Sequence, residues 1–206
     1  MRQLTPAQEE FFKNSKFKNA DGSLKVVYHG TVSEFDTFKN MKKQYDSFNR
    51  ETGFFFTDNK SEADSHGIRK GGETLEVYLN LKNPLDISIN GNFEILDKLV
   101  KDCYPNTNWQ QEHLCTNKFK EHLNSQGYDS LIIYDIVIAY EPNQIKSIDN
   151  LYPTLNDNFK NNKEDYFKAT SIKELPSFDD MLDIAEAKAA KQNSGLKFKS
   201  KNEIER

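Results

Sequence analysis

A histidine, a glycine and a threonine follow one another directly after a short apolar run. The run is Val26-Val27-Tyr28, and His29, Gly30 and Thr31 come next. β-Branched and aromatic residues favour a buried strand, so this triplet is expected at or near the strand's C-terminal end. A glycine there lets the backbone approach a ligand closely, because no side chain intervenes. The alternative is a histidine that only caps a core strand, and these residues alone do not choose between the two.

A second stretch that could contribute to a functional site is rich in aromatic residues. Residues 52–57, with the sequence TGFFFT, predict a short strand, and residues 61–66 predict a helix that ends before Gly67. Side chains alternate between the two faces of a strand. At least one of Phe54, Phe55 and Phe56 is therefore expected to be a core residue without any other role.

The elements that must position these residues indicate an α+β fold. Thr5 and Pro6 suit the N-cap and first position of a helix over 5–13, and residues 39–50 indicate a loop or short helix. Residues 68–72 and 141–143 predict turns, and residues 83–86 are expected to end a strand. The remaining predicted helices cover 93–102 and 109–125, and the remaining predicted strands cover 74–81, 130–134, 136–140 and 144–148.

Length and composition predict one domain and a tail. The chain has 206 residues, of which 36% are hydrophobic, so either the core is small or part of the chain lies outside it. Fifteen Phe and nine Tyr argue against wholesale disorder, because aromatic side chains bury large areas. We predict a folded domain over 1–150 and a polar tail over 151–206, with a helix near 177–191. A chain ending after Asn150 is expected to remain folded.

Charge, cysteine spacing and hydropathy argue against a nucleic-acid-binding, metal-binding, membrane-spanning or secreted protein. The formal net charge of −4 gives no general attraction to nucleic acid. The spacing of Cys103, His113, Cys115 and His122 matches no usual set of metal ligands, so no metal site is expected. No apolar run is long enough to span a bilayer, and the first residues lack the apolar core of a secretory signal. A cytoplasmic protein, or one delivered into the cytoplasm of a host cell, is the expectation.

Three segments stand in an order that resembles a known family. They are YHGT after a strand, GFFFTDNKSEA as strand and helix, and YEPNQIKS near the end of the predicted domain. Together they resemble the ADP-ribosyltransferase domain of phage and mobile-element polyvalent proteins, in the PARP and diphtheria-toxin-like superfamily. The resemblance covers about residues 1–150. It implies a split antiparallel β-sheet with flanking helices, and a transferase that uses NAD as co-substrate and needs no metal.

The resemblance also implies roles for individual residues. The superfamily's His-Gly pair matches His29-Gly30: the histidine hydrogen-bonds the nicotinamide ribose, and the glycine backbone pairs with the carboxamide. Thr31, the next residue, is also expected to bind NAD. Phe55 stands where relatives have a stacking tyrosine, so the ring is kept and the hydroxyl is lost. His66, eleven residues further on, would cover the other side of the nicotinamide. None of the four arginines lies on the first strand, which argues against the arginine-dependent class of this fold.

The third catalytic position is where the sequence departs most from the family. Relatives carry a glutamate at the start of a strand, and counting back from Gln144 places Ile136 there, which cannot do the same chemistry. Asp135 is adjacent, but it needs a bulge to reach the same face. We favour Asp135, then Gln144, and then Glu141, which also fits a simple hairpin turn.

The implied reaction is transfer of a single ADP-ribose unit from NAD. A nearby carboxylate stabilises the positive charge that develops on the ribose and can orient the acceptor. The acceptor is not identified by the sequence, and a protein is favoured over nucleic acid. Two alternatives remain open. One is an inactive module of the same fold that binds NAD or another nucleotide, and the other is an interaction protein whose tail helix docks a partner.

Overall fold

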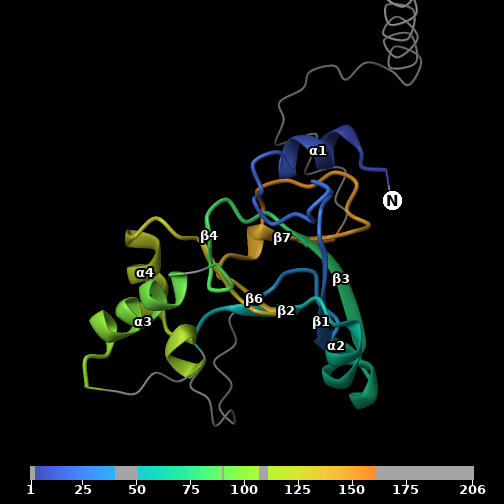
Figure 1. The fold of residues 1–206 in the computed structure, drawn as a ribbon. Helices are drawn as coiled ribbons and strands as arrows, with labels where there is room; N and C mark the ends of the chain where they lie inside the picture. The colour runs from blue at the N-terminus through green and yellow to red at the C-terminus, as the bar shows by residue number, and fades with distance from the viewer. Residues whose placement is uncertain (1–2, 40–50, 90, 107–110, 161–206) are drawn as a thin grey trace, which may run out of the picture. The chain divides into compact units, whose positions relative to one another are not determined.

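The computed structural model describes residues 3–39, 51–89, 91–106 and 111–160 (Figure 1). Residues 40–50 and the helix expected near 177–191 lie outside the described residues. Helix α1 (Pro6–Phe12) begins as predicted. The Thr5 hydroxyl accepts a hydrogen bond from the Gln8 amide, and the Gln8 side chain accepts one from the Thr5 amide. This reciprocal cap satisfies backbone donors that the first helical turn leaves unpaired.

A seven-stranded sheet forms the centre of the described chain, in the order β4-β5-β6-β2-β1-β3-β7. The strands are β1 (Val26–Thr31), β2 (Phe54–Thr57), β3 (Glu73–Leu79), β4 (Pro84–Asp86), β5 (Ser130–Ile133), β6 (Ile136–Ala139) and β7 (Ile145–Ser147). The other helices described are α2 (Lys60–His66), α3 (Asn92–Cys103) and α4 (Asn117–Ser125), with 3-10 turns η1 (Ile68–Lys70), η2 (Gln111–Cys115) and η3 (Pro142–Gln144). Neighbouring strands are antiparallel except β4 and β5. The predicted α+β class is confirmed.

Two predicted elements differ from the structure. The helix expected over 109–125 is interrupted, because η2 ends at Cys115 and Thr116 starts the new helix α4 by accepting a hydrogen bond from the Phe119 amide. Threonine is favoured at this capping position over a helix interior. Residues 83–86 do more than end a strand, because Leu85 pairs with Leu131 in the parallel ladder of β4 and β5. β4 is an edge strand, where proline is tolerated at the first residue.

The sheet is split between β1 and β2. The ladder of β1 and β2 has one registered pair, Tyr28 opposite Thr57, whereas β1 and β3 share six. The strands β4, β5, β6 and β2 form one half of the sheet, and β1, β3 and β7 form the other. This is the split antiparallel sheet that the resemblance predicted.

Alternation places two separate cores on the two faces of the sheet. We call these the His29 face and the Gly30 face, after neighbouring residues of β1. The His29 face carries Phe17, Val27, Phe38, Phe54, Phe56, Val77, Leu79, Leu81, Val137, Ala139, Ile145 and Phe159 in its core. The Gly30 face carries Leu85, Ile87, Leu96, Leu99, Val100, Cys103, Leu114, Phe119, Leu123, Leu131, Ile138 and Tyr140 in its core. Helices α3 and α4 contribute to the second core, and α2 packs on β1, β2 and β3 (Figure 1).

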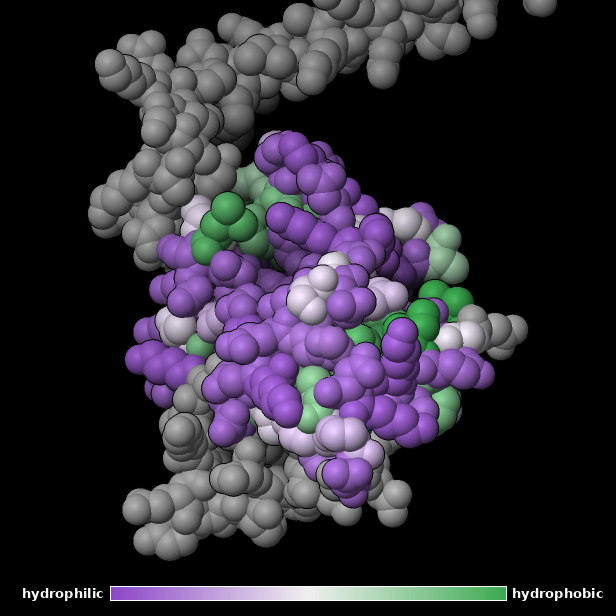
Figure 2. All heavy atoms as spheres, turned by 90° about the vertical axis from the view of Figure 1, so that its left-hand side faces the viewer, coloured by the Kyte–Doolittle hydropathy of each residue, from purple (hydrophilic) through white to green (hydrophobic). Residues whose placement is uncertain are grey.

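The surface on the α3 and α4 side is mainly hydrophilic. Figure 2 shows this side with only a few small hydrophobic areas among hydrophilic side chains. No helix in the described ranges combines the length and the apolar character needed to cross a bilayer.

The packed structure extends past residue 150, where we expected the tail to begin. Phe159 is 2% exposed and belongs to the core on the His29 face. Its carbonyl accepts a hydrogen bond from the Ser147 amide at 2.8 Å, and its amide donates to the Asp36 carbonyl at 3.0 Å. The polar composition of 151–160 concealed this one large apolar side chain, so the expectation that 1–150 suffices is not supported.

Lys146 gives a second reason why residues 151–160 belong to the fold. Its side chain on β7 is fully buried, and its ammonium donates to the carbonyls of Asn156 at 2.6 Å and Asn158 at 2.8 Å. Burial lowers the pKa of Lys146 to about 8, against the opposing effect of the nearby Asp157 carboxylate. A buried ammonium is costly without such partners, so removal of 151–160 would leave it unsatisfied.

We expect Phe159→Ala to lower the free energy of unfolding by about 3–5 kcal/mol, as for other buried phenylalanines. Leu155→Ala, in the same segment, is the matched control, because Leu155 is 70% exposed and should change stability by less than about 0.5 kcal/mol. Urea unfolding of both variants measures the difference. Equal, small effects would show that 151–160 is not part of the stable core.

Candidate functional site

His29 lies where β1 and β2 separate. Its Nδ1 is 2.8 Å from the carbonyl oxygen of Phe55 on β2. The ring packs against Phe38 and Phe56, with centroids 5.1 and 5.5 Å away. A carbonyl oxygen can only accept, so Nδ1 carries the proton and donates. The imidazole therefore bridges the two strands beyond the pair of Tyr28 and Thr57.

The surroundings of His29 favour its neutral form. Burial lowers the pKa of His29 below its ordinary value of 6.5, the hydrogen bond to the Phe55 carbonyl partly opposes this, and the nearby His66 lowers the pKa further. With the proton on Nδ1, Nε2 keeps its lone pair and can accept a hydrogen bond. A hydroxyl group is a suitable donor to that nitrogen.

Gly30 allows helix α2 to lie directly on β1. A methyl group on Gly30 would lie 2.1 Å from the Ala63 carbonyl oxygen, 2.7 Å from the Gly67 nitrogen and 2.9 Å from the His66 Cβ. The sequence suggested that this glycine makes room for a ligand. In the structure the end of a helix makes the close approach, and this packing brings His66 beside Gly30.

Phe55 and His66 come from the two elements that flank the split. Phe55 is on the Gly30 face of β2 and packs partly against the core there. His66 is the last residue of α2 and is exposed. Gly30, Phe55 and His66 thus lie on the Gly30 face, and His29 reaches the same split from the opposite face through its contact with the Phe55 carbonyl. These are four of the residues that we predicted to bind nicotinamide.

Thr31 lies at the end of β1 and is partly buried. Its hydroxyl donates to the Ser33 carbonyl and accepts from the Ser33 amide, both at 3.1 Å. This pattern closes a local turn after the strand. Thr31 is adjacent to the site, with its hydroxyl engaged in the turn.

Asp135 lies at the tip of the hairpin formed by β5 and β6. Ile133 pairs directly with Ile136, which leaves Tyr134 and Asp135 as the turn, and Tyr134 has a left-handed φ of 57°. The described register runs from Ser130 opposite Ala139 to this pair without the bulge that Asp135 was expected to need. Asp135 is exposed.

The position of Asp135 along β6 separates it from His29. The row of the sheet that contains His29 continues through Phe56 to Val137, because Tyr28 is opposite Thr57 and Phe56 is opposite Val137. Asp135 is two residues from Val137, with β2 between β6 and β1. Standard strand spacings place the two Cα atoms on the order of 12 Å apart. Ile136, and not a carboxylate, faces Thr57.

Gln144 holds the turn before β7. Its Oε1 accepts from the amides of Tyr140 and Glu141 at 3.0 and 2.9 Å, and its Nε2 donates to the Asp129 carbonyl at 3.2 Å. The side chain is 7% exposed. Its amide group therefore satisfies three backbone groups of the turn.

Gln144 and Glu141 are not brought to His29. The Gln144 carbonyl accepts from the Asn80 amide, five residues along the chain from Leu75, the β3 partner of His29. Five residues of extended chain span about 17 Å. The Glu141 carboxylate instead pairs with Lys120 at 2.6 Å.

One carboxylate near the site was missed by the sequence reasoning. The Thr57 hydroxyl donates to Glu62 Oε2 at 3.4 Å, and Glu62 is partly buried on α2. The signal was present in the sequence: Glu62 and His66 are four residues apart, so they share one side of the predicted helix. Asp135 and Glu141, the two carboxylates that the sequence favoured, both lie later in the chain.

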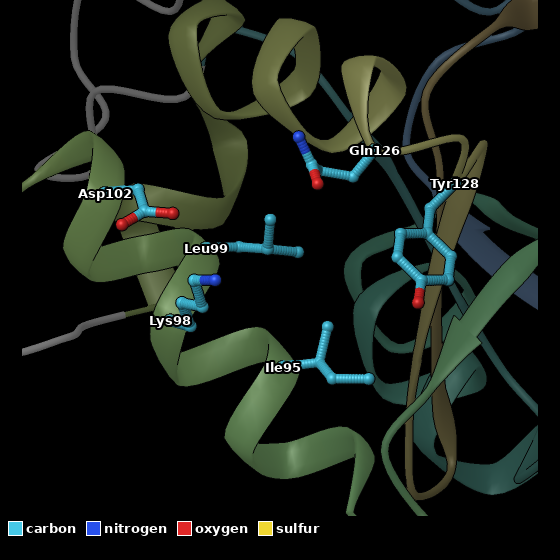
Figure 3. A pocket seen from close by; sticks show the side chains of 6 residues that line it. All are labelled: Ile95, Lys98, Leu99, Asp102, Gln126 and Tyr128. Atoms are coloured by element: carbon cyan, nitrogen blue, oxygen red, sulfur yellow. The ribbon is translucent and has the colours of Figure 1, made fainter.

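A half-open hollow lies elsewhere in the described part of the chain. It has a volume of about 220 Å³ and lies between α3 and the end of α4 (Figure 3). Its walls are Ile95, Lys98, Leu99, Asp102, Gln126 and Tyr128. None of these is a predicted site residue, so the hollow is separate from the split between β1 and β2.

The cysteines and histidines considered as metal ligands have other surroundings. Cys103 and Cys115 are buried free thiols, and His113 stacks on Tyr104 with a centroid distance of 4.6 Å. His122 Nε2 lies 3.5 Å from the Asp102 carboxylate. In the residues that the structure describes, no three His, Cys, Asp or Glu side chains are grouped so that they could hold an ion.

Comparison with known proteins identifies the family. The sequence model described as ADP-ribosyltransferase in polyvalent proteins matches residues 19–155. The chain belongs to this family. The match includes His29, Phe55, Glu62 and His66, and it confirms the resemblance seen in the three sequence segments.

Other comparisons add little. No curated protein matches the chain. One solved structure, titled "Crystal structure of an anti-CRISPR protein", is 16% identical over 58% of this chain and 93% of that chain, with a TM-score of 0.33. A similarity at this level supports no argument about the present protein.

The lowered pKa of His29 predicts a dependence of stability on pH. Below pH about 6.5 the unfolded chain takes up a proton on this histidine before the folded chain does, so the free energy of unfolding falls as the pH falls. Urea unfolding at pH 7.5 and 5.5 should show a smaller loss in His29→Gln than in the parent. An equal loss in both proteins would mean that His29 is not the buried neutral group.

Proposed function

We propose that this ADP-ribosyltransferase family member cleaves the nicotinamide–ribose bond of NAD and transfers one ADP-ribose unit to a macromolecular acceptor. The observation that carries the proposal is the His29 imidazole between β1 and β2, with Gly30, Phe55 and His66 around it. The acidic net charge of −4 favours a protein over nucleic acid as acceptor. The two free cysteines suit the reducing cytoplasm, of either the producing cell or a host, as the place of action.

Each residue around the split has a distinct role in the proposed NAD complex. The rings of Phe55 and His66 lie against the two sides of the nicotinamide, and the Gly30 main chain hydrogen-bonds its carboxamide. His29 Nε2 accepts a hydrogen bond from a hydroxyl of the adjoining ribose. An aromatic face retains the stacking energy without the tyrosine hydroxyl, so the phenylalanine at position 55 is compatible with this role.

The proposed chemistry requires little from the protein beyond binding and charge stabilisation. When the bond to nicotinamide breaks, positive charge develops on the ribose, and a fixed carboxylate lowers the energy of that state. The sequence proposed Asp135 or Gln144 for this third position. The exposed tip position of Asp135 and the three hydrogen bonds of Gln144 weaken both assignments.

A second candidate function is supported by one observation. Ile136 faces Thr57 at the strand position where relatives place the catalytic glutamate. A protein that binds NAD or another nucleotide without turnover would need no carboxylate there. Incubation of the purified protein with NAD alone separates the two functions, because an active transferase slowly releases nicotinamide to water and a binding module does not.

We expect His29→Ala to lower the rate of nicotinamide release by about 10²-fold or more while the protein stays folded. The physical reason is loss of the bridging side chain and of the acceptor for the ribose hydroxyl. Nicotinamide release, measured by chromatography, and thermal unfolding are the two readouts. A large fall in the melting temperature with an unchanged rate per folded molecule would show that His29 is only a core residue.

We expect His66→Ala to weaken NAD binding by about 3- to 10-fold and His66→Tyr to restore it, as loss and recovery of one ring contact would. Calorimetric titration with NAD measures the dissociation constants. Lys70→Ala is the control, because Lys70 is exposed on the following turn. Parental affinity in His66→Ala would exclude the histidine from the nicotinamide site.

A further inference from the structure

Glu62 places a carboxylate next to the strand position where the family glutamate is missing. Its Oε2 lies 3.4 Å from the Thr57 hydroxyl. Thr57 is opposite Tyr28 on one side and Ile136 on the other. The carboxylate therefore reaches the row of Ile136 from helix α2, and not from strand β6.

The chain geometry places Glu62 one step from the proposed nicotinamide site. Phe55 and Thr57 are two residues apart on β2, so they share the Gly30 face at a separation of about 7 Å. Glu62 and His66 are four residues apart on α2, so they share one helix side at a separation of about 6 Å. The chain reverses direction at residues 58 and 59. Helix α2 therefore runs back along β2, so Glu62 is nearer to Thr57 and His66 is nearer to Phe55.

One contact at each end of α2 supports this alignment of the helix with β2. Glu62 contacts Thr57 at the end near the reversal. At the far end, the His66 Cβ lies 2.9 Å from the position of a methyl group on Gly30. Gly30 is two residues past Tyr28 and Phe55 is two residues before Thr57, so Gly30 and Phe55 lie level with each other across the split. A ring between Phe55 and His66 would thus have the Glu62 carboxylate on the side where its attached ribose can lie.

The other two acidic or basic side chains of α2 pair with residues of β3, although the Lys60 ammonium also lies 5.6 Å from the ring centroid of Tyr28, the β1 partner of Thr57. Asp64 accepts a hydrogen bond from the Thr74 hydroxyl on β3 at 2.7 Å. Lys60 pairs with Glu76 on β3 at 2.6 Å. The described partner of the Glu62 carboxylate is the hydroxyl of Thr57, so its contact with β2 does not neutralise its charge.

We propose that Glu62 is the catalytic carboxylate of this site, in place of a glutamate on β6. The inference rests on the proposed function. The bond between the ribose C1′ and the nicotinamide nitrogen breaks, and its electron pair stays on nitrogen, which neutralises the pyridinium. The Glu62 carboxylate stabilises the positive ribose carbon. A lone pair of the acceptor, or of water in its absence, forms the new bond to C1′, and the proton of the acceptor passes to Glu62 and then to solvent.

The test compares Glu62→Gln with the parent and with Asp64→Asn. Glutamine keeps the size and the contact with Thr57 but carries no charge. We expect Glu62→Gln to lower kcat for nicotinamide release by about 10²-fold or more, with the dissociation constant for NAD changed by less than about threefold. Asp64→Asn, which removes a charge two residues further along the helix, should keep kcat within about threefold. Thermal unfolding confirms that each variant is folded.

The remaining outcomes overturn the inference in distinguishable ways. A parent that hydrolyses NAD with kcat unchanged in Glu62→Gln refutes the role of Glu62 and leaves the proposed function standing. Loss of turnover in Asp135→Asn, with Glu62→Gln near parental, reassigns the carboxylate to the β5–β6 turn. A parent that binds NAD without releasing nicotinamide refutes both the role and the proposed function.

Discussion

The hydrogen bond between the His29 imidazole and the Phe55 carbonyl links β1 and β2 at the point where their backbone pairing ends. It occupies the place where backbone pairing between β1 and β2 would otherwise continue past Tyr28 and Thr57. One such bond contributes only about 0.5–1.5 kcal/mol, but it is supported by the rings of Phe38 and Phe56 around the imidazole. The same side chain thus keeps the sheet split and presents Nε2 as an acceptor. A sheet that was paired throughout would leave no gap between the two strands.

The second constraint is backbone contact between α2 and the strands. A methyl group on Gly30 or Gly67 would lie 2.1 Å from a carbonyl oxygen of the neighbouring segment. Side chains of any size would push the helix away from β1 and β3. Because the helix lies so close, its rotation about its own axis is fixed, and one side is turned toward β2. Glu62 contacts β2 from that side, and His66, four residues further along the helix, lies beside Gly30 of β1.

The segment that follows β7 shows how burial can be hidden by composition. Residues 151–160 are polar, yet they supply Phe159 to the core and two carbonyls to the buried Lys146 ammonium. A polar stretch contributes to a core when a few of its groups satisfy partners that the sheet has already buried. The family match, which ends at residue 155, also continues past the boundary predicted at 150. This segment supports the site indirectly, because Phe159 packs against Phe38, whose ring contacts His29.

The sequence by itself determined the local elements and the family. The Thr5 cap, the strands at His29 and Phe55 and the helix ending at His66 follow from residue types and spacings within a few positions, which is the range over which backbone preferences act. Through the family motifs it also pointed to His29, Gly30, Phe55 and His66, which the structure places around the split between β1 and β2. Only the tertiary structure decided which carboxylate stands near that group. Asp135 is adjacent to the motif position in sequence, but a tight turn carries it to the hairpin tip. Glu62 comes from another element, and it lies near the site because Gly30 and Gly67 let α2 pack closely on the sheet. Contacts of this kind depend on how separate elements pack, and spacing along the chain does not encode them directly.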